Sequence, residues 1–219
     1  MQIAIDGPAG AGKSTIAKKI AKDSGFIYVD TGAMYRAMAL YLIRQGIAPE
    51  DKAGIETACD SADISIRYAD GEQQVILNGE NVNGLIRTQE VSNMASASSV
   101  NPKVREKLVA LQQKLAASTD VVMDGRDIGT KVLPDAEVKI YLTASTRVRA
   151  KRRYDELIEK GESCDLDTIE KEIAERDERD MNREISPLRQ ADDAVLVDTS
   201  DMDIDEVVEE IDRIIKEHK

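Results

Sequence analysis

Cysteine and histidine are scarce in this sequence, and their scarcity narrows the chemistry available to it. Among 219 residues the only cysteines are Cys59 and Cys164, and the only histidine is His218. The cysteines are isolated and lack metal-ligand spacing, so we expect unpaired thiols in a reducing compartment. We expect His218, close to the end of the sequence, to be solvated. Histidine catalysis and metal sites with histidine ligands are therefore nearly excluded.

Basic residues are in the minority, which limits the partners that we expect. The sequence has 30 Lys and Arg against 42 Asp and Glu, for a net charge of -12. Such a surface repels nucleic acid and anionic membranes, and attracts anions only where cations gather locally. Apolar runs are too short to span a bilayer, and no signal-peptide pattern occurs. We expect a cytoplasmic protein with no nucleic-acid polymer and no membrane as a partner.

Short apolar runs alternate with amphipathic stretches along most of the sequence. Runs rich in Val, Ile or Ala predict buried parallel strands at residues 2–5, 26–29, 121–123, 138–142 and 194–197. Helical spacing predicts helices at residues 14–22, 32–45, 104–117, 146–160, 168–183 and 204–216. This alternation predicts an α/β fold, a five-stranded parallel sheet flanked by helices.

One region interrupts the alternation between strands and helices. The pairs Asp70-Gly71 and Asn78-Gly79 separate short strand-like runs, and both are strong hairpin signals. We predict a small antiparallel meander there, with an acidic helix before it and a helix at residues 87–99 after it. The meander forms a subdomain inserted between elements of the core.

A glycine-rich motif follows the first predicted strand. Gly7 to Ser14 spell G-x-x-x-x-G-K-S, between an apolar strand and an amphipathic helix, a context that disfavours a chance turn. In such a loop backbone N–H groups cradle phosphates, Lys13 reaches the β- and γ-phosphates, and Ser14 can ligate Mg²⁺. The dipole of the following helix favours anions. We assign a nucleotide's phosphates to Gly7, Pro8, Ala9, Gly10, Ala11, Gly12, Lys13, Ser14 and Thr15.

Polar residues at the end of the second predicted strand are candidates for binding a second ligand group beside the phosphate loop. Ligands of open α/β sheets bind at the carboxyl ends of the strands. Asp30 or Thr31 can cap the following helix. Arg36 lies one turn into that helix, where a cation is unfavourable to the dipole. A bound anion would offset this cost, so we interpret Arg36 as a phosphate ligand rather than a surface arginine.

The third predicted strand ends in a second polar group. Asp124 follows apolar residues, like the carboxylate that holds Mg²⁺ or its water in P-loop enzymes. Arg126 offers a planar fork for phosphate oxygens. Asp127 can accept from an amino group, as acidic side chains accept from cytosine N4. The alternative for Asp127 is a turn or cap residue.

Two further groups of charges lie on the long helices near residues 146–183. Arg176, Asp180 and Arg183 share one helical face. They form either surface ion pairs of little value or cations for phosphate with a carboxylate for sugar hydroxyls. Five basic residues begin the earlier helix, either as a solvated face or as part of a closing lid. They are Arg147, Arg149, Lys151, Arg152 and Arg153, and we expect the last two to contribute to a lid.

Together these motifs resemble bacterial cytidylate kinases over essentially the whole sequence. The most specific pieces are IDGPAGAGKST (5–15), DTGAMYR (30–36), IRTQEV (86–91), DGRDIGT (124–130) and ERDERDMNR (175–183). The resemblance implies a monomer with a P-loop NTPase fold. It implies an enzyme that transfers a phosphoryl group from ATP to CMP or dCMP with Mg²⁺. It also implies one domain with a core (1–60, 101–150 and 184–219), a monophosphate-binding insert (61–100) and a lid (151–183).

The same resemblance implies roles for individual residues. The CMP ligands would be Thr31, Arg36, Ser96, Arg105, Arg126, Asp127, Arg176, Asp180 and Arg183. The catalytic residues would be Lys13, Arg126, Arg152, Arg153 and Arg183, and the Mg²⁺ ligands Ser14 and Asp124. Thr31 departs from relatives with Ser there, which bears on the preference between CMP and dCMP; at Ser14, where relatives can carry Gly or Thr, the hydroxyl is kept.

Two rival functions stay open at this point. The first is a P-loop kinase with another small acceptor, such as UMP, AMP or shikimate. The second is a nucleotide-dependent switch, which predicts a guanine-specifying N-K-x-D motif. The sequence has no such motif, and its arginine-rich pattern favours transfer to a small molecule.

Overall fold

The computed structural model describes residues 1–69 and 71–218, so Asp70 of the predicted Asp-Gly turn lies outside the described residues. The chain divides into two compact units. The first unit contains residues 1–28 and the chain from residue 119 onward, and the second contains residues 29–118.

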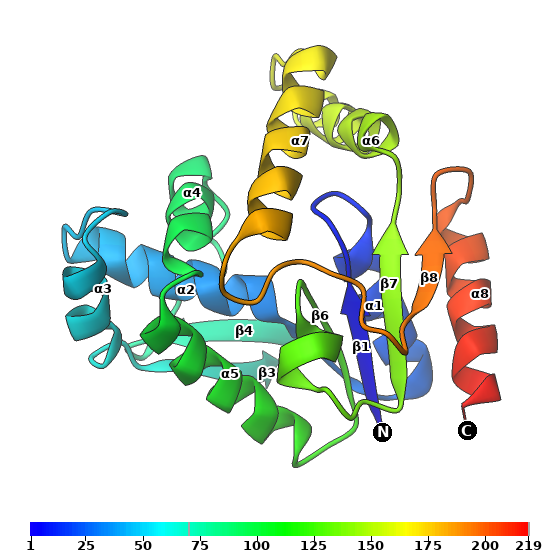
Figure 1. Ribbon diagram of the computed structural model, residues 1–219, viewed down its shortest axis with the longest axis horizontal. Coiled ribbons are helices and arrows are strands. Elements are labelled where there is room, and N and C mark those ends of the chain that lie inside the picture. The colour runs from blue at the N-terminus through cyan, green and yellow to red at the C-terminus, as the bar shows by residue number, and fades with distance from the viewer. Residues whose placement is uncertain (70, 219) are drawn as a thin grey trace. The chain divides into compact units, whose positions relative to one another are not determined.

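The first unit is built on a five-stranded sheet with the order β2-β6-β1-β7-β8 (Figure 1). β1 pairs in parallel with β6 and with β7, and β7 pairs in parallel with β8. β2 crosses from this unit into the second. The strands are β1 (Gln2–Asp6), β2 (Ile27–Asp30), β6 (Val121–Gly125), β7 (Val138–Thr143) and β8 (Val195–Asp198).

Helices of the first unit cover the sheet and extend beyond its carboxyl end. α1 and α8 pack with the sheet around a core that includes Ile5, Ile20, Ile140 and Ile211. α6 and α7 pack against each other and lie above the upper end of β7 in Figure 1. The bounds are α1 (Lys13–Ser24), α6 (Thr146–Glu159), α7 (Leu166–Asn182), α8 (Ile204–Glu217) and a π-helical segment, η1 (Ile128–Val132).

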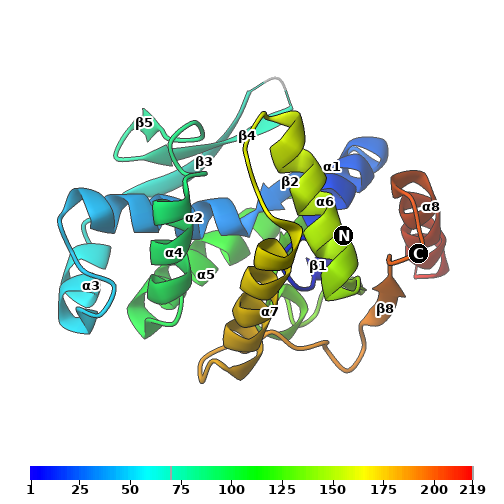
Figure 2. The ribbon, with the colours of Figure 1, turned by 90° about the horizontal axis from the view of Figure 1, so that it is seen from above.

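The second unit is arranged around α2, which contacts its other helices and the strands β3 and β4. Figure 2 shows α4 crossing α2 in this unit. β3, β4 and β5 form an antiparallel sheet in that order. The bounds are α2 (Thr31–Arg44), α3 (Lys52–Cys59), β3 (Ile64–Ala69), β4 (Glu72–Leu77), β5 (Glu80–Asn81), α4 (Gln89–Ser98) and α5 (Pro102–Ala116).

The predicted fold class is confirmed, because the parallel sheet, its flanking helices and the separate antiparallel meander all occur. The bounds differ by a few residues at element ends, where local signals are weakest. The π-helical segment was not predicted, because no sequence pattern marks its wider turn. The division into core, insert and lid stays a prediction. In the described part of the chain no helix is long and apolar enough to cross a bilayer.

Candidate active site

The phosphate loop lies between β1 and α1, and its glycines are required by close packing and backbone shape. A Cβ on Gly7 would lie 1.9 Å from the Leu142 carbonyl oxygen of β7. Gly12 precedes α1 with φ of 89°, a left-handed conformation that other residues adopt only with strain. The motif therefore forms the strand–loop–helix turn that phosphate binding needs.

Lys13 is buried at the start of α1, and its ammonium group is held inside the loop. Its Nζ donates a hydrogen bond to the Pro8 carbonyl oxygen at 2.7 Å. Burial, and then the positive charge of Arg126, lower the pKa of Lys13 to about 7. An anion bound beside this group would offset both effects, because it stabilises the charged ammonium.

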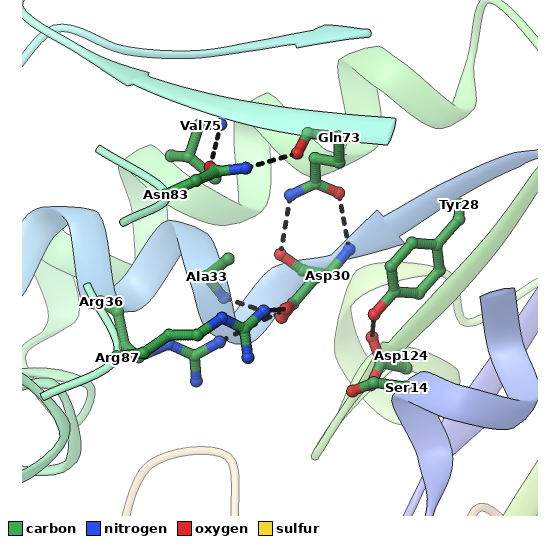
Figure 3. Close-up of polar contacts among 10 residues, drawn as sticks. All are labelled: Ser14, Tyr28, Asp30, Ala33, Arg36, Gln73, Val75, Asn83, Arg87 and Asp124. Carbon is green, nitrogen blue, oxygen red and sulfur yellow. Dashed lines mark hydrogen bonds and ion pairs between the residues drawn. The ribbon is translucent and has the colours of Figure 1, made fainter. Parts of the chain in front are cut away.

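Ser14 and Asp124, the two residues predicted as Mg²⁺ ligands, lie in hydrogen-bond contact, and their metal role stays a prediction (Figure 3). The Ser14 hydroxyl donates to Asp124 Oδ2 at 2.8 Å, and the Tyr28 hydroxyl donates to Asp124 Oδ1 at 3.0 Å. A hydroxyl beside a carboxylate is the hard oxygen pair that suits Mg²⁺. Within the described residues no cluster of three or more His, Cys, Asp or Glu could hold a metal. These two oxygens fit an ion that takes its other ligands from phosphates and water.

Arg126 and Asp180 pair across the first unit. Arg126 Nε donates to Asp180 Oδ2 at 2.9 Å, and both side chains are mostly buried. Burial alone would raise the pKa of Asp180, but Arg126, Arg176 and Arg183 outweigh it and the pKa is lowered. Arg183 Nε also donates to the Ser186 carbonyl oxygen. The charges of three arginines thus keep the Asp180 carboxylate ionised near the C-terminal end of α7. The sequence predicted Arg176 and Arg183 on the same helical face as Asp180, whereas Arg126 directly follows the end of β6.

The arginines at the start of α6 have different partners. Arg149 Nη1 donates to the Ala9 carbonyl oxygen of the phosphate loop at 2.9 Å, and its Nη2 lies 2.6 Å from Asp177 Oδ2. Arg152 donates to Thr199, and Arg153 pairs with the exposed Glu156. The lid roles of Arg152 and Arg153 stay predictions, whereas Arg149 is the member that contacts the loop.

Asp6 is a residue that the sequence reasoning missed. Its carboxylate accepts hydrogen bonds from the backbone N–H groups of Ile128 (2.8 Å) and Gly129 (2.7 Å). Burial, against those two bonds, raises the pKa of Asp6 to about 6. Asp6 thereby fixes the start of η1, directly after Arg126 and Asp127. The sequence did carry a signal for Asp6, because a carboxylate stands at the end of an apolar strand and directly before the phosphate loop.

In the second unit Asp30 organises the start of α2 (Figure 3). Its Oδ1 accepts from the Ala33 N–H at 2.8 Å and so caps the helix. Its Oδ2 lies 3.3 Å from Arg36 Nη2 and 3.6 Å from Arg87 Nη2. The pair packs closely over Gly32, where a Cβ would lie 3.2 Å from Asp30 Oδ1 and 3.3 Å from Arg36 Nη1. Arg87 lies within the motif IRTQEV (86–91) but was not predicted as a site residue.

The other predicted residues of this unit lie on α2, α4 and α5. Thr31 is the buried first residue of α2, and Ser96 is half-buried on α4. Arg105 is buried on α5, and its Nη1 donates to the Ser99 carbonyl oxygen at 3.4 Å. Its Cζ atom lies 5.7 Å from the centre of the Tyr35 ring. The Arg105–Tyr35 contact links α5 to α2, the helix that carries Arg36.

Comparison with known proteins places these features in a class. The family model described as cytidylate kinase matches residues 3–217. A cytidylate kinase of Ligilactobacillus salivarius (strain UCC118) is 52% identical over 99% of this chain and 97% of its own length. One of Streptococcus sanguinis (strain SK36) is 54% identical over 95% of this chain and 93% of its own.

A solved structure agrees at the level of the fold alone. An uncharacterized protein from Eubacterium ventriosum ATCC 27560 covers 99% of this chain and 98% of its own, with a TM-score of 0.55 at 13% identity. The parallel sheet and the phosphate loop, with the Ser14–Asp124 hydrogen bond beside it, define a P-loop kinase. The chain belongs to the cytidylate kinase family, which consists of nucleoside monophosphate kinases.

Proposed function

We propose that this chain transfers the γ-phosphoryl group of ATP to CMP or dCMP and produces ADP and CDP or dCDP. The match of residues 3–217 to the cytidylate kinase family carries this conclusion. The charge inventory of the two units supports it, because phosphoryl transfer depends mainly on positioning and neutralisation of charge. No strong general base is required, which agrees with the single histidine.

The donor half would be the loop from Gly7 to Thr15. Its N–H groups and Lys13 would hold the ATP phosphates, with Lys13 turning from the Pro8 carbonyl oxygen to the β- and γ-oxygens. Ser14 and Asp124 would hold Mg²⁺, which neutralises charge on the β- and γ-phosphates when bound. A phosphate oxygen of CMP attacks the γ-phosphorus, and the bond to the β–γ bridging oxygen breaks.

The acceptor half would draw its phosphate ligands from arginines that are now neutralised by aspartates. Arg36 and Arg87 share Asp30 Oδ2, and Arg126 holds Asp180 Oδ2. Within the described residues the buried Arg36 Nε has no hydrogen-bond partner, so a phosphate would add a bond that it lacks. Arg183 would be the further phosphate ligand.

The nucleoside and lid roles are carried over from the family resemblance. Ser96, Arg105 and Asp127 would read the cytosine, and Thr31, Arg176 and Asp180 would face the ribose. Arg152 and Arg153 would act as lid arginines on the transferring group. We also propose a monomer that works in the cytoplasm and takes only small nucleotides, in keeping with its net charge of -12.

A coupled assay of ADP release across acceptors tests the reaction. We expect turnover with CMP and dCMP, weaker turnover with UMP, and background with AMP and shikimate, because Asp127 and Arg105 suit the cytosine edge. Faster turnover with AMP or shikimate than with CMP would overturn the proposal. Hydrolysis of ATP that no acceptor stimulates would favour a nucleotide switch instead.

A further inference from the structure

The side chain of Gln73 pairs with the backbone of Asp30 as a neighbouring strand would (Figure 3). The Asp30 N–H donates to Gln73 Oε1 at 2.8 Å, and Gln73 Nε2 donates to the Asp30 carbonyl oxygen at 3.2 Å. β2 is an edge strand of its sheet, so an outer strand does not supply these bonds. One side-chain amide therefore fixes both backbone polar groups of Asp30.

Fixing the Asp30 backbone also fixes its carboxylate. Oδ1 is committed to the Ala33 N–H, so Oδ2 has one direction left in which to point. In that direction lie Arg36 and Arg87, both in contact with the same oxygen. The position of this oxygen therefore sets where the two guanidinium groups stand before a phosphate arrives.

Gln73 is itself held in place by the antiparallel sheet. Asn83 Nδ2 donates to the Gln73 carbonyl oxygen at 2.7 Å, and the Val75 N–H donates to Asn83 Oδ1 at 2.8 Å. Because β5 ends at Asn81, the Asn83 side chain continues the pairing of β4 beyond that strand. At the other end of α2, Arg44 pairs with Glu80 of β5. The small sheet is thus tied to both ends of the helix that carries Arg36.

We propose that Gln73 is a positioning residue for the acceptor phosphate, acting through Asp30 on Arg36 and Arg87. This inference rests on the proposed function. It assigns the antiparallel sheet the role of positioning the arginines that bind the acceptor phosphate. Loss of the Gln73 amide removes two hydrogen bonds and lets the Asp30 backbone turn. The arginines then lose their preset position, which weakens CMP binding in the ground state and the transition state alike.

The test compares Gln73→Met with Gln74→Met in the purified full chain. Both residues are half-buried neighbours on β4, and their side chains alternate to opposite faces of the strand. For Gln73→Met we expect the KM for CMP to rise roughly tenfold, with kcat and the KM for ATP changed by less than about twofold. Gln74→Met should leave all three constants near those of the wild type. An equal KM for CMP in both variants would overturn the inference.

A second measurement separates positioning from general loss of structure. In an Arg36→Met background, Gln73→Met should raise the KM for CMP by less than about threefold, because one of the two arginines on which it acts is gone and only Arg87 remains at Asp30. A full effect in both backgrounds would overturn the proposed route through Asp30. If Gln73→Met does not fold, Gln73→Asn serves in its place, since it keeps the amide but is one methylene too short.

The two proposals fail in different ways. If the wild type does not phosphorylate CMP, the proposed function is wrong. If the wild type phosphorylates CMP and the two glutamine variants behave alike, only the role of Gln73 is wrong.

Discussion

Individual buried charges in the first unit have pKa values shifted toward neutral pH. Burial raises the pKa of Asp6 to about 6 and lowers the pKa of Lys13 to about 7. Both residues flank the phosphate loop, where desolvation is strong and counter-charges are incomplete. Perturbed groups in such a place are typical of functional sites. Asp6 has the clearer structural role, because its bonds to Ile128 and Gly129 hold the chain that follows Asp127.

We predict that the free energy of unfolding depends on pH differently in the wild type and in Asp6→Asn. The folded pKa of Asp6, about 6, lies above the ordinary value of 3.8, so the folded state binds more protons between these values. Its contribution to the free energy of unfolding is fully present below about pH 4 and is lost as the pH rises through about 6. Relative to Asp6→Asn, the wild type should therefore lose up to about 3 kcal/mol over this range.

Urea unfolding of both proteins from about pH 4 to about pH 7.5 measures this difference. Groups that lie away from Asp6 titrate equally in the two proteins, so their contributions cancel in the comparison. A difference in unfolding free energy that stays constant over this range would contradict the prediction.

At the scale of elements, a buried ion pair joins α6 to α7 and to the phosphate loop. Arg149 and Asp177 are both nearly inaccessible to solvent, and Arg149 also donates to the carbonyl oxygens of Ala144 and Ala9. The apolar contact between these helices buries Ala150, Ile169 and Ile173, and Tyr154, Leu157, Cys164 and Leu166 pack against these residues while partly buried. The ion pair adds a directional contact to this apolar packing, and Arg149 links it to the phosphate loop.

We predict that Arg149→Met lowers the free energy of unfolding by about 3 kcal/mol, because it leaves Asp177 buried without its counter-charge. The double variant Arg149→Met, Asp177→Leu should lose less than the sum of the two single variants. Urea unfolding measures all three. Arg153→Met is the matched control, since its exposed pair with Glu156 is worth about 1 kcal/mol or less. Additive losses at Arg149 and Asp177 would show that the pair is not coupled.

At the scale of the whole molecule, the proposed ligands are divided between the two units. All residues proposed to hold the donor, from Gly7 to Thr15 with Asp124, belong to the first unit. The proposed CMP ligands belong to both: Thr31, Arg36, Ser96 and Arg105 to the second, and Arg126, Asp127, Arg176, Asp180 and Arg183 to the first. ATP and CMP should therefore protect different segments of the chain when they bind.

We predict this difference in amide hydrogen exchange. A non-hydrolysable ATP analogue with Mg²⁺ should slow exchange in the phosphate loop and the start of α1, and leave the start of α2 unchanged. CMP alone should slow exchange at the start of α2 and also around residues 126–129, because ordered contacts reduce local opening. Protection by CMP that is confined to one unit would contradict the divided assignment. Cytidine, which lacks the phosphate, is the control for the segment around Arg36.

The sequence predicted most of the fold because the signals for its elements are local. Apolar runs without alternation became the strands of the parallel sheet, and the Asn78-Gly79 turn connects β4 to β5. The phosphate motif was also predictable, since it is a contiguous strand–loop–helix turn. Contacts within the candidate site were predictable only in part. Ser14 with Asp124 followed from a motif pair, but Arg87 at Asp30 and Arg149 at Ala9 did not.

The sequence by itself determined the kind and order of the elements, the position of the phosphate-loop motif and, through its motifs, the family. The tertiary structure decided which partner each buried polar group has. Asp6 meets Gly129 across 123 residues, Arg149 meets Ala9 across 140, and Gln73 meets Asp30 across 43. The physical reason is that periodicity and turn chemistry act over a few residues. A hydrogen bond between distant residues depends instead on strand order and register, which are fixed only when the whole core packs.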